Sequence, residues 1–193
     1  MTSLVCLLAA SLAAQPRAQE GVSRASSPPS ATRTAAARPS PDHDRLDVLA
    51  GTFRFERTTT LPGGTPQRSI GLSENRWILD NRYLECRAVE TEDDGSVGDE
   101  SLVTYGFDLR RRVFFAVLLG SRGSNYQTLE GFYDDPARSF VLIGKDAGDG
   151  RIPGPKLRQV VRIDGPDRYV VELFTVAVGR LPQKIVEITY SRQ

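Results

Sequence analysis

Few residues of this chain have the types and spacing that metal or nucleophilic chemistry requires. His43 is the single histidine, and a zinc site normally draws on several His or Cys ligands. After Cys6, Cys86 is the one remaining cysteine, so the folded part offers it neither a disulfide partner nor an activating histidine on the strands. We therefore expect no metal and no cofactor. His43 should be exposed or packed in a lid, and Cys86 should be a small buried residue.

The acidic and glycine-rich motifs are typical of turns and loops. Asp134-Asp135 precedes a proline, and Asp146, Asp149 and Gly150 lack the alternating ligands of a calcium-binding loop. Residues 120–124 have neither the Lys-Ser/Thr ending of a phosphate loop nor the spacing of a nucleophile elbow. Because no pair of carboxylates stands out for hydrolysis, the sequence predicts no catalytic residue.

The elements that must position any site are strands. Turn signals such as Pro62-Gly63-Gly64 and Asp93-Asp94-Gly95 separate ten runs of strand composition. The runs are 52–60, 67–79, 82–91, 100–108, 112–119, 126–134, 138–145, 156–164, 167–178 and 183–192. Short connections favour sequential antiparallel neighbours. The pattern therefore predicts an all-β fold, either a sandwich or an antiparallel up-and-down β-barrel of about ten strands.

One short helix is expected before the first strand. Ser40 can cap it, Pro41 suits its first turn, and Gly51 ends it. Leu46 and Leu49 would fall on one side of this helix and form a small apolar lid.

Two runs rich in aromatic and aliphatic residues meet at Asp80-Asn81 and predict a hairpin. Both residue types tolerate the positive φ angles of a two-residue turn. That turn sets Trp77 opposite Leu84 and Arg76 opposite Glu85, with the apolar and charged pairs on opposite faces. Two alternatives remain open. The charged residues form a ladder outside the sheet, or they form an Arg/Glu cluster inside a polar cavity.

Motifs along nearly the whole folded part resemble one bacterial family. They are Leu49-Ala50-Gly51-Thr52-Phe53, Arg76-Trp77-Ile78-Leu79, Arg82-Tyr83-Leu84-Glu85, Gly106-Phe107-Asp108, Gly131-Phe132-Tyr133-Asp134 and Val186-Glu187-Ile188-Thr189-Tyr190-Ser191-Arg192. In order and spacing they resemble the bacterial domain of unknown function 1579, from about His43 to the C-terminus. That family is thought to be related to the lipocalin-like β-barrels. The resemblance implies a closed barrel with an internal cavity, and it implies no agreed activity.

The first forty residues are expected to lie outside the fold. Residues 4–14 form an apolar run of 11 residues, short of the roughly 20 that a membrane-spanning helix needs. Ser11-Leu12-Ala13 offers small residues to a signal peptidase. We expect a signal peptide over 1–14, a flexible Ala/Ser/Pro/Arg-rich tether over 15–40 and a single β-barrel domain over 41–193. The protein would then be exported, periplasmic or extracellular, with no transmembrane segment in the mature chain.

The positive charge of the chain is concentrated in that tether. The net charge is +1, and residues 15–41 hold four Arg against one Glu, so the barrel domain is weakly acidic. Because phosphate recognition needs a clustered basic face, we expect no nucleic-acid partner.

The hairpin over residues 156–174 supplies the expected polar spot of the cavity. A two- or four-residue turn at 164–167 pairs Gln159 with Glu172 among apolar neighbours. A change of register by one residue would instead turn Glu172 to solvent. The candidate ligand pocket therefore consists of five residues: Trp77, Arg76, Glu85, Gln159 and Glu172.

The favoured function is an exported, non-enzymatic barrel that binds a small, largely apolar ligand in its interior. One alternative is a barrel packed solid with side chains that acts as an interaction module. The other is an enzyme of the same fold. A cavity would separate the first from the second, because small barrels can be hollow or filled. A convergent acid–base pair inside that cavity would indicate the third. The oligomeric state is left open.

Overall fold

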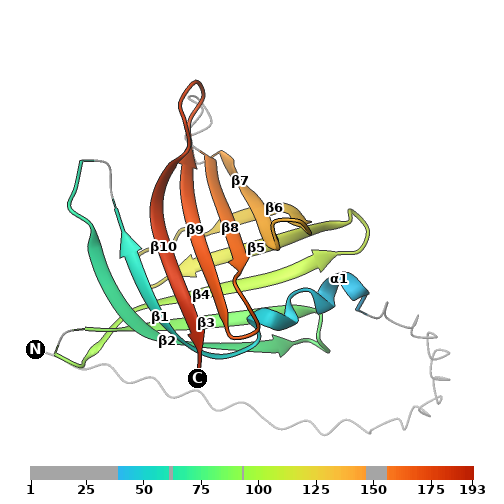
Figure 1. Cartoon of the computed structure of the whole chain (residues 1–193), viewed down its shortest axis with the longest axis horizontal. Coiled ribbons are helices and arrows are strands. Elements are labelled where there is room, and N and C mark those ends of the chain that lie inside the picture. Colours follow the sequence, from blue (N-terminus) through green and yellow to red (C-terminus); the bar gives the residue numbers. More distant parts are fainter. Residues whose placement is uncertain (1–38, 61–62, 93, 147–155) are drawn as a thin grey trace, which may run out of the picture. The chain divides into compact units, whose positions relative to one another are not determined.

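The computed structural model describes residues 39–60, 63–92, 94–146 and 156–193. Within them the chain forms a closed antiparallel barrel (Figure 1). Its strands are β1 Gly51–Thr59, β2 Gln67–Ile78, β3 Tyr83–Thr91, β4 Val97–Asp108, β5 Val113–Gly120, β6 Gln127–Asp134, β7 Ser139–Asp146, β8 Lys156–Ile163, β9 Arg168–Val176 and β10 Gln183–Arg192. Each strand pairs with its neighbours in sequence, and β10 pairs with β1 to close the ring. The predicted all-β up-and-down barrel is confirmed, and the sandwich is excluded. The predicted signal peptide, and all but the last two residues of the predicted tether, lie outside the described residues.

The predicted helix is present as two consecutive turns, α1 Pro41–Asp44 and the 3-10 helix η1 Asp47–Leu49. Leu46 and Leu49 are buried, as expected of a lid. His43 is buried with them, edge-on to the Phe107 ring at 5.8 Å between ring centres. Its Nδ1 accepts a hydrogen bond of 3.0 Å from the backbone N–H of Ser40. Of the two expectations for His43, packing in the lid is therefore correct.

Aromatic rings fill the end of the barrel that this lid covers. A ring of eight strands is about as wide as side chains can fill, so ten strands need large residues to close the interior. The buried rings that supply this bulk are Phe53, Phe55, Phe107, Phe114, Phe140, Tyr169 and Tyr190. Gly71 on β2 makes room for one of them, because a Cβ there would lie 2.5 Å from the Phe55 ring. Bulky packing is thus concentrated at one end.

The β2–β3 hairpin has the predicted register. Trp77 lies opposite Leu84 and Arg76 opposite Glu85, and the Arg76 and Glu85 side chains form an ion pair of 2.9 Å on the outside. The charged ladder is therefore correct, and the cluster inside a cavity is wrong. The turn is longer than predicted, since the strands end at Ile78 and Tyr83. Positive φ angles extend over residues 79–81, which widens the turn without changing the pairing.

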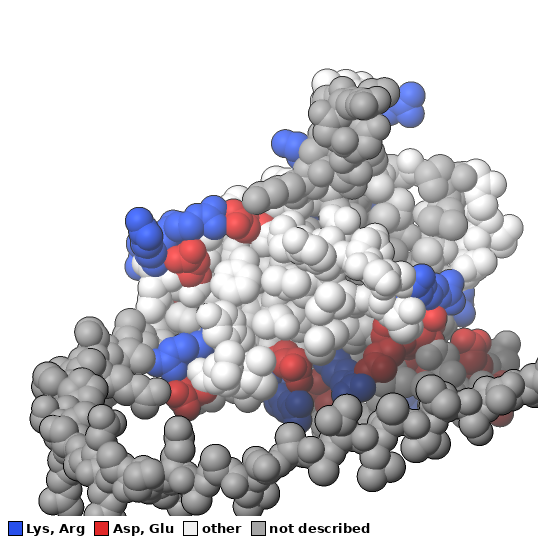
Figure 2. All heavy atoms as spheres, turned by 180° about the vertical axis from the view of Figure 1, so that it is seen from behind, with Lys and Arg blue, Asp and Glu red and all other residues white. Residues whose placement is uncertain are grey.

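The outer face of β5 is apolar for a surface strand. Val113–Gly120 contains no charged residue, and Leu119, Phe132 on β6 and Ile143 on β7 are all exposed. Seen from behind Figure 1, the molecule has a broad area without Lys, Arg, Asp or Glu, and charged groups gather around it (Figure 2). A closed barrel leaves no unpaired strand edge there, so the exposed groups are side chains and not backbone.

Raising the pH should destabilise the barrel through its buried weak acids. Burial raises the pKa of the Cys86 thiol above its ordinary 9.0 and the pKa of Tyr105, Tyr169 and Tyr190 above the ordinary 10.0. The unfolded chain loses these protons first, so the native state binds more protons and the free energy of unfolding falls above about pH 9. Urea unfolding at a series of pH values should show this fall. Cys86→Val should reduce it between about pH 9 and 10, and a flat profile would contradict the burial.

Candidate functional site

A cavity of about 240 Å³ lies inside the barrel, beyond the aromatic packing and toward the end opposite the lid. Strands β1, β4, β5, β8, β9 and β10 contribute to its wall. Most of the lining is aliphatic, including Val103, Leu118, Val171, Leu173, Val186 and Ile188. The inward-facing rows of these strands carry rings near the lid and smaller branched residues farther along, which leaves the space unfilled. The interior is therefore hollow at this end.

Three polar side chains line the deep part of the cavity. Gln159 on β8 is 2% exposed, and its side chain hydrogen-bonds to the phenol of Tyr105 on β4. Its Oε1 has no hydrogen-bond partner. Tyr190 on β10 is the third polar group. Burial raises the pKa of both tyrosines, so each phenol keeps its proton at neutral pH. The deep cavity is thus neutral, with a few groups that can form hydrogen bonds.

An ion pair lies where the cavity opens. Arg57 on β1 reaches across β2 to Glu90 on β3, and the two side chains are 21% and 8% exposed. Arg57 and Thr59 line both the cavity and a wider polar depression of about 630 Å³ outside it. A second pair, Arg122 with Asp99, lies at the wall of that depression. The opening is therefore charged but internally balanced.

Hydrogen bonds close the opposite end. The Asn75 amide nitrogen donates to the Leu49 carbonyl at 2.6 Å and to the Tyr169 phenol oxygen at 3.0 Å. The Ser73 hydroxyl donates to Asn75 Oδ1 at 2.6 Å. These bonds join the lid to the barrel wall, and they give both the nitrogen and the oxygen of the Asn75 amide a partner. Any access to the cavity from solvent is therefore expected at the Arg57 end.

The structure separates the predicted site residues. Trp77 points inward but lies at the closed end, where its indole N–H donates to the Asp47 carboxylate at 2.8 Å. Arg76 and Glu85 lie on the outer face of the barrel. None of the three lines the cavity. Side-chain alternation gives the reason, since Arg76 lies one residue before Trp77 and Glu85 lies one residue after Leu84.

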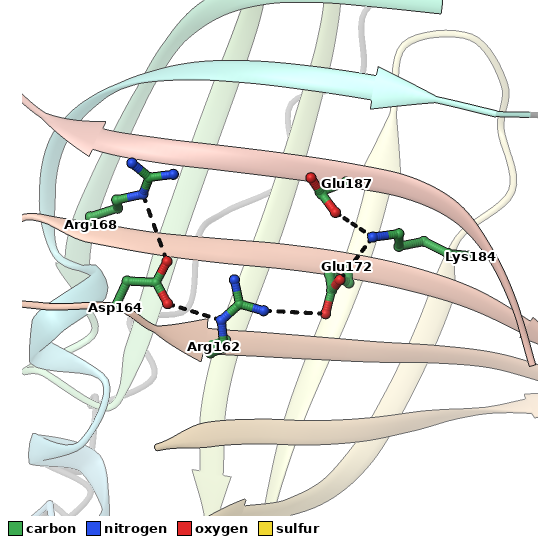
Figure 3. A network of polar contacts seen from close by, with 6 residues as sticks. All are labelled: Arg162, Asp164, Arg168, Glu172, Lys184 and Glu187. Carbon is green, nitrogen blue, oxygen red and sulfur yellow. Dashed lines mark hydrogen bonds and ion pairs between the residues drawn. The ribbon is translucent and has the colours of Figure 1, made fainter. Parts of the chain in front are cut away.

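The structure places Gln159 in the cavity wall, but its predicted pairing with Glu172 is wrong. Gln159 lies opposite Leu173, and Glu172 lies on the outer face between Lys184 at 3.1 Å and Arg162 at 3.8 Å (Figure 3). Five residues, 164–168, separate Ile163 from its partner Tyr169. An odd loop length shifts the register by one residue, and this shift turns Glu172 outward. Its side chain is less exposed than that of Arg162 (17% against 46%) because neighbouring ion pairs cover it.

The residues at the opening and the two tyrosines were not among the predicted site residues. Strand alternation could have found Arg57, which follows Phe53 and Phe55 at a spacing of two residues. The same rule places Glu90 after Cys86 and Ala88. A charged residue in an inward row was the available signal. The partner, however, is 33 residues away, and nothing local in the sequence indicates that pairing.

Two further properties bear on the chemistry. Over the part of the chain that the structure describes, no group of three or more His, Cys, Asp or Glu side chains could hold a metal ion. No helix in that same part is long and apolar enough to cross a membrane.

Residues 38–192 match the family described as protein of unknown function DUF1579. The chain belongs to this family. No curated protein matches its sequence. Among solved structures, Rv2717c from M. tuberculosis is similar at 18% identity and a TM-score of 0.60, over 80% of this chain and 98% of that one. The S-type phycobiliprotein lyase CPES from Guillardia theta is 11% identical, with a TM-score of 0.49 over 80% and 98% of the two chains. At 18% identity, the similarity to Rv2717c shows the fold alone.

The pair at the opening should be more strongly coupled than the pair on the outer ladder. In a double-mutant cycle measured by urea unfolding, we expect a coupling of about 1–3 kcal/mol between Arg57 and Glu90. The control cycle on Arg76 and Glu85, which are 74% and 22% exposed, should give roughly 0.2–1 kcal/mol, because solvent screens that pair. Equal couplings would mean that the Arg57–Glu90 pair is solvated like a surface pair.

Proposed function

We propose that this barrel binds a small, largely apolar molecule in its interior. The observation that carries the proposal is the cavity of about 240 Å³ with its mainly aliphatic wall. Binding sites for small molecules are typically concave and apolar, with a few polar groups that fix orientation. The cavity has this composition, since Gln159 and the two tyrosines lie among branched aliphatic side chains.

The size of the cavity limits the ligand. An apolar cavity of about 150 Å³ is enough to hold benzene, while pockets for drug-sized molecules begin at roughly 300 Å³. A cavity of about 240 Å³ falls between these values. It suits one ring with a short alkyl chain, or an aliphatic molecule of similar bulk.

The electrostatics of the site favour a neutral ligand. Arg57 and Glu90 satisfy each other at the opening, so neither offers an uncompensated charge to an ionic group. Deeper in, the polar groups are an amide and two protonated phenols. Burying an unpaired charge among them would cost far more than burying a neutral polar group. The described residues of the cavity also contain no carboxylate pair that could act as acid and base.

The N-terminal sequence supports export of this binding protein. Residues 4–14 have the length and small-residue ending of a signal peptide. N-terminal sequencing of the protein from its own host should find a chain that begins near Ala14 or Gln15. Recovery of intact Met1 in a soluble cytoplasmic pool would overturn the assignment without affecting the cavity.

Filling the cavity should abolish binding. Val103 on β4 lines the cavity, whereas Val117 on the adjacent β5 has the opposite orientation in the pleat. In NMR titrations of the full chain with propylbenzene, we expect saturable shifts of inward-facing residues. Val103→Trp should weaken binding by about tenfold or more because the indole occupies the space, and the matched Val117→Trp should leave the dissociation constant within about twofold.

Two results would contradict the proposal. One is the absence of saturable binding of any apolar probe to the unmodified chain. The other is equal loss of binding in the two tryptophan variants, which would place the probe on the outer surface. Native mass spectrometry of protein purified from its own host would then identify the natural ligand as a co-purified molecule.

A further inference from the structure

Two buried carboxamides lie inside the barrel, and their hydrogen bonding differs. Asn75, at the closed end, uses its amide fully. It accepts from Ser73 and donates to both the Leu49 carbonyl and Tyr169. Gln159, in the cavity wall, hydrogen-bonds to Tyr105 but leaves Oε1 without a partner. Among the described residues, Gln159 Oε1 is the single buried side-chain oxygen or nitrogen in that condition.

The surroundings of Gln159 bear on why its Oε1 has no hydrogen-bond partner. Its inward-facing neighbours on β8 are Leu157 and Val161, and the side chain is 2% exposed. An aliphatic residue would suit that row equally well and would carry no unpaired oxygen. Buried polar groups nearly always have a hydrogen-bond partner, and leaving an acceptor unpaired costs stability. A partner supplied from the cavity is the physical reason that fits a glutamine at this place.

We propose that Gln159 is the polar anchor of the cavity and that its Oε1 accepts a hydrogen bond from a hydroxyl group of the bound ligand. The inference rests on the proposed binding function and narrows it to small apolar alcohols and phenols. A hydroxyl both donates and accepts, so it can bond Gln159 and also face the phenols of Tyr105 and Tyr190, which line the same cavity.

The local geometry allows this contact. The terminal torsion of a glutamine has a broad energy minimum, so a rotation of the whole amide that brings Oε1 to the cavity costs little torsional energy. Tyr105 and Tyr190 keep their protons because burial raises the pKa of each. An ammonium donor is disfavoured at this depth, because no carboxylate is among the described residues that line the cavity. Glu90, in the depression outside it, is already paired with Arg57.

The test uses three probes of one shape. In 4-propylphenol the ring carries a hydroxyl, in 4-propyltoluene a methyl group replaces it, and in 4-propylanisole the oxygen can accept but not donate. Each is titrated calorimetrically into the full chain and into the Gln159→Met variant, whose side chain has similar length and no hydrogen-bonding amide. Thr104→Ala, which removes a hydroxyl from the outer face of β4 opposite Val117, is the matched control.

We expect Gln159→Met to weaken the binding of 4-propylphenol by roughly five- to tenfold, which is the range that the loss of one hydrogen bond gives. Binding of 4-propyltoluene and 4-propylanisole should change by less than about twofold, because neither can donate to Oε1. Thr104→Ala should leave the dissociation constants of all three probes within the same limit. In the unmodified chain, 4-propylphenol should shift the side-chain amide NMR signals of Gln159 further than 4-propyltoluene, whose ring alone perturbs them. This difference tests the contact even if the variant fails to fold.

The failures are distinguishable. Gln159→Met could weaken the binding of 4-propylphenol and 4-propyltoluene equally, or the binding of neither. Gln159 would then contribute shape alone, and the inference would be overturned while the binding function stands. If 4-propylanisole loses as much affinity as 4-propylphenol, the amide acts as a donor and the assignment of a hydroxyl donor is overturned. If no probe saturates the unmodified chain, the proposed function fails and this inference fails with it.

Discussion

Side-chain alternation in a closed ring is the constraint on which the rest of this structure depends. Every residue of a strand faces either the interior or the outside, and closure of β10 on β1 leaves no edge where the rule could be relaxed. Ten strands enclose more space than ordinary aliphatic side chains fill. The chain solves this at the lid end with aromatic rings such as Phe53 and Phe140. At the other end, Val103, Val171 and Val186 do not fill the interior, and the cavity remains between them. Fold and candidate site therefore follow from one pattern of residue sizes along the inward rows.

The same constraint explains why one hairpin could be predicted from the sequence and another could not. In β2–β3 the turn is marked by Asp80-Asn81, and an even loop preserves the pairing even though the turn is longer than expected. In β8–β9, the segment 164–167 is rich in turn residues but does not fix where pairing resumes. It resumes at Tyr169, after five residues. A single residue of loop length moved Glu172 from the predicted pocket to the outer ion-pair network.

The residues of the candidate site also differ in how far the sequence could predict them. Gln159 could be placed in the interior because its own strand alternates cleanly with Leu157, Val161 and Ile163. That inference needs no knowledge of the neighbouring strand. Arg57 and Glu90 could not be recognised as a pair, because their contact spans β2 and depends on the shear and twist of the ring. Local sequence thus predicts which way a residue points, while contacts across the barrel require the closed structure.

The two ends of the barrel also assign different roles to chemically similar groups. At the lid, Asn75 binds the Leu49 carbonyl and Tyr169, so its amide is part of what closes the interior. At the cavity, Gln159 is equally buried but keeps an unpaired acceptor. Burial alone would class both as structural polar residues. Their hydrogen bonds distinguish them. Asn75 already has partners for its amide nitrogen and oxygen, whereas Gln159 has an acceptor beside the cavity that still requires a partner. In a family of unknown function, this difference is the feature that points from the architecture to the chemistry of a ligand.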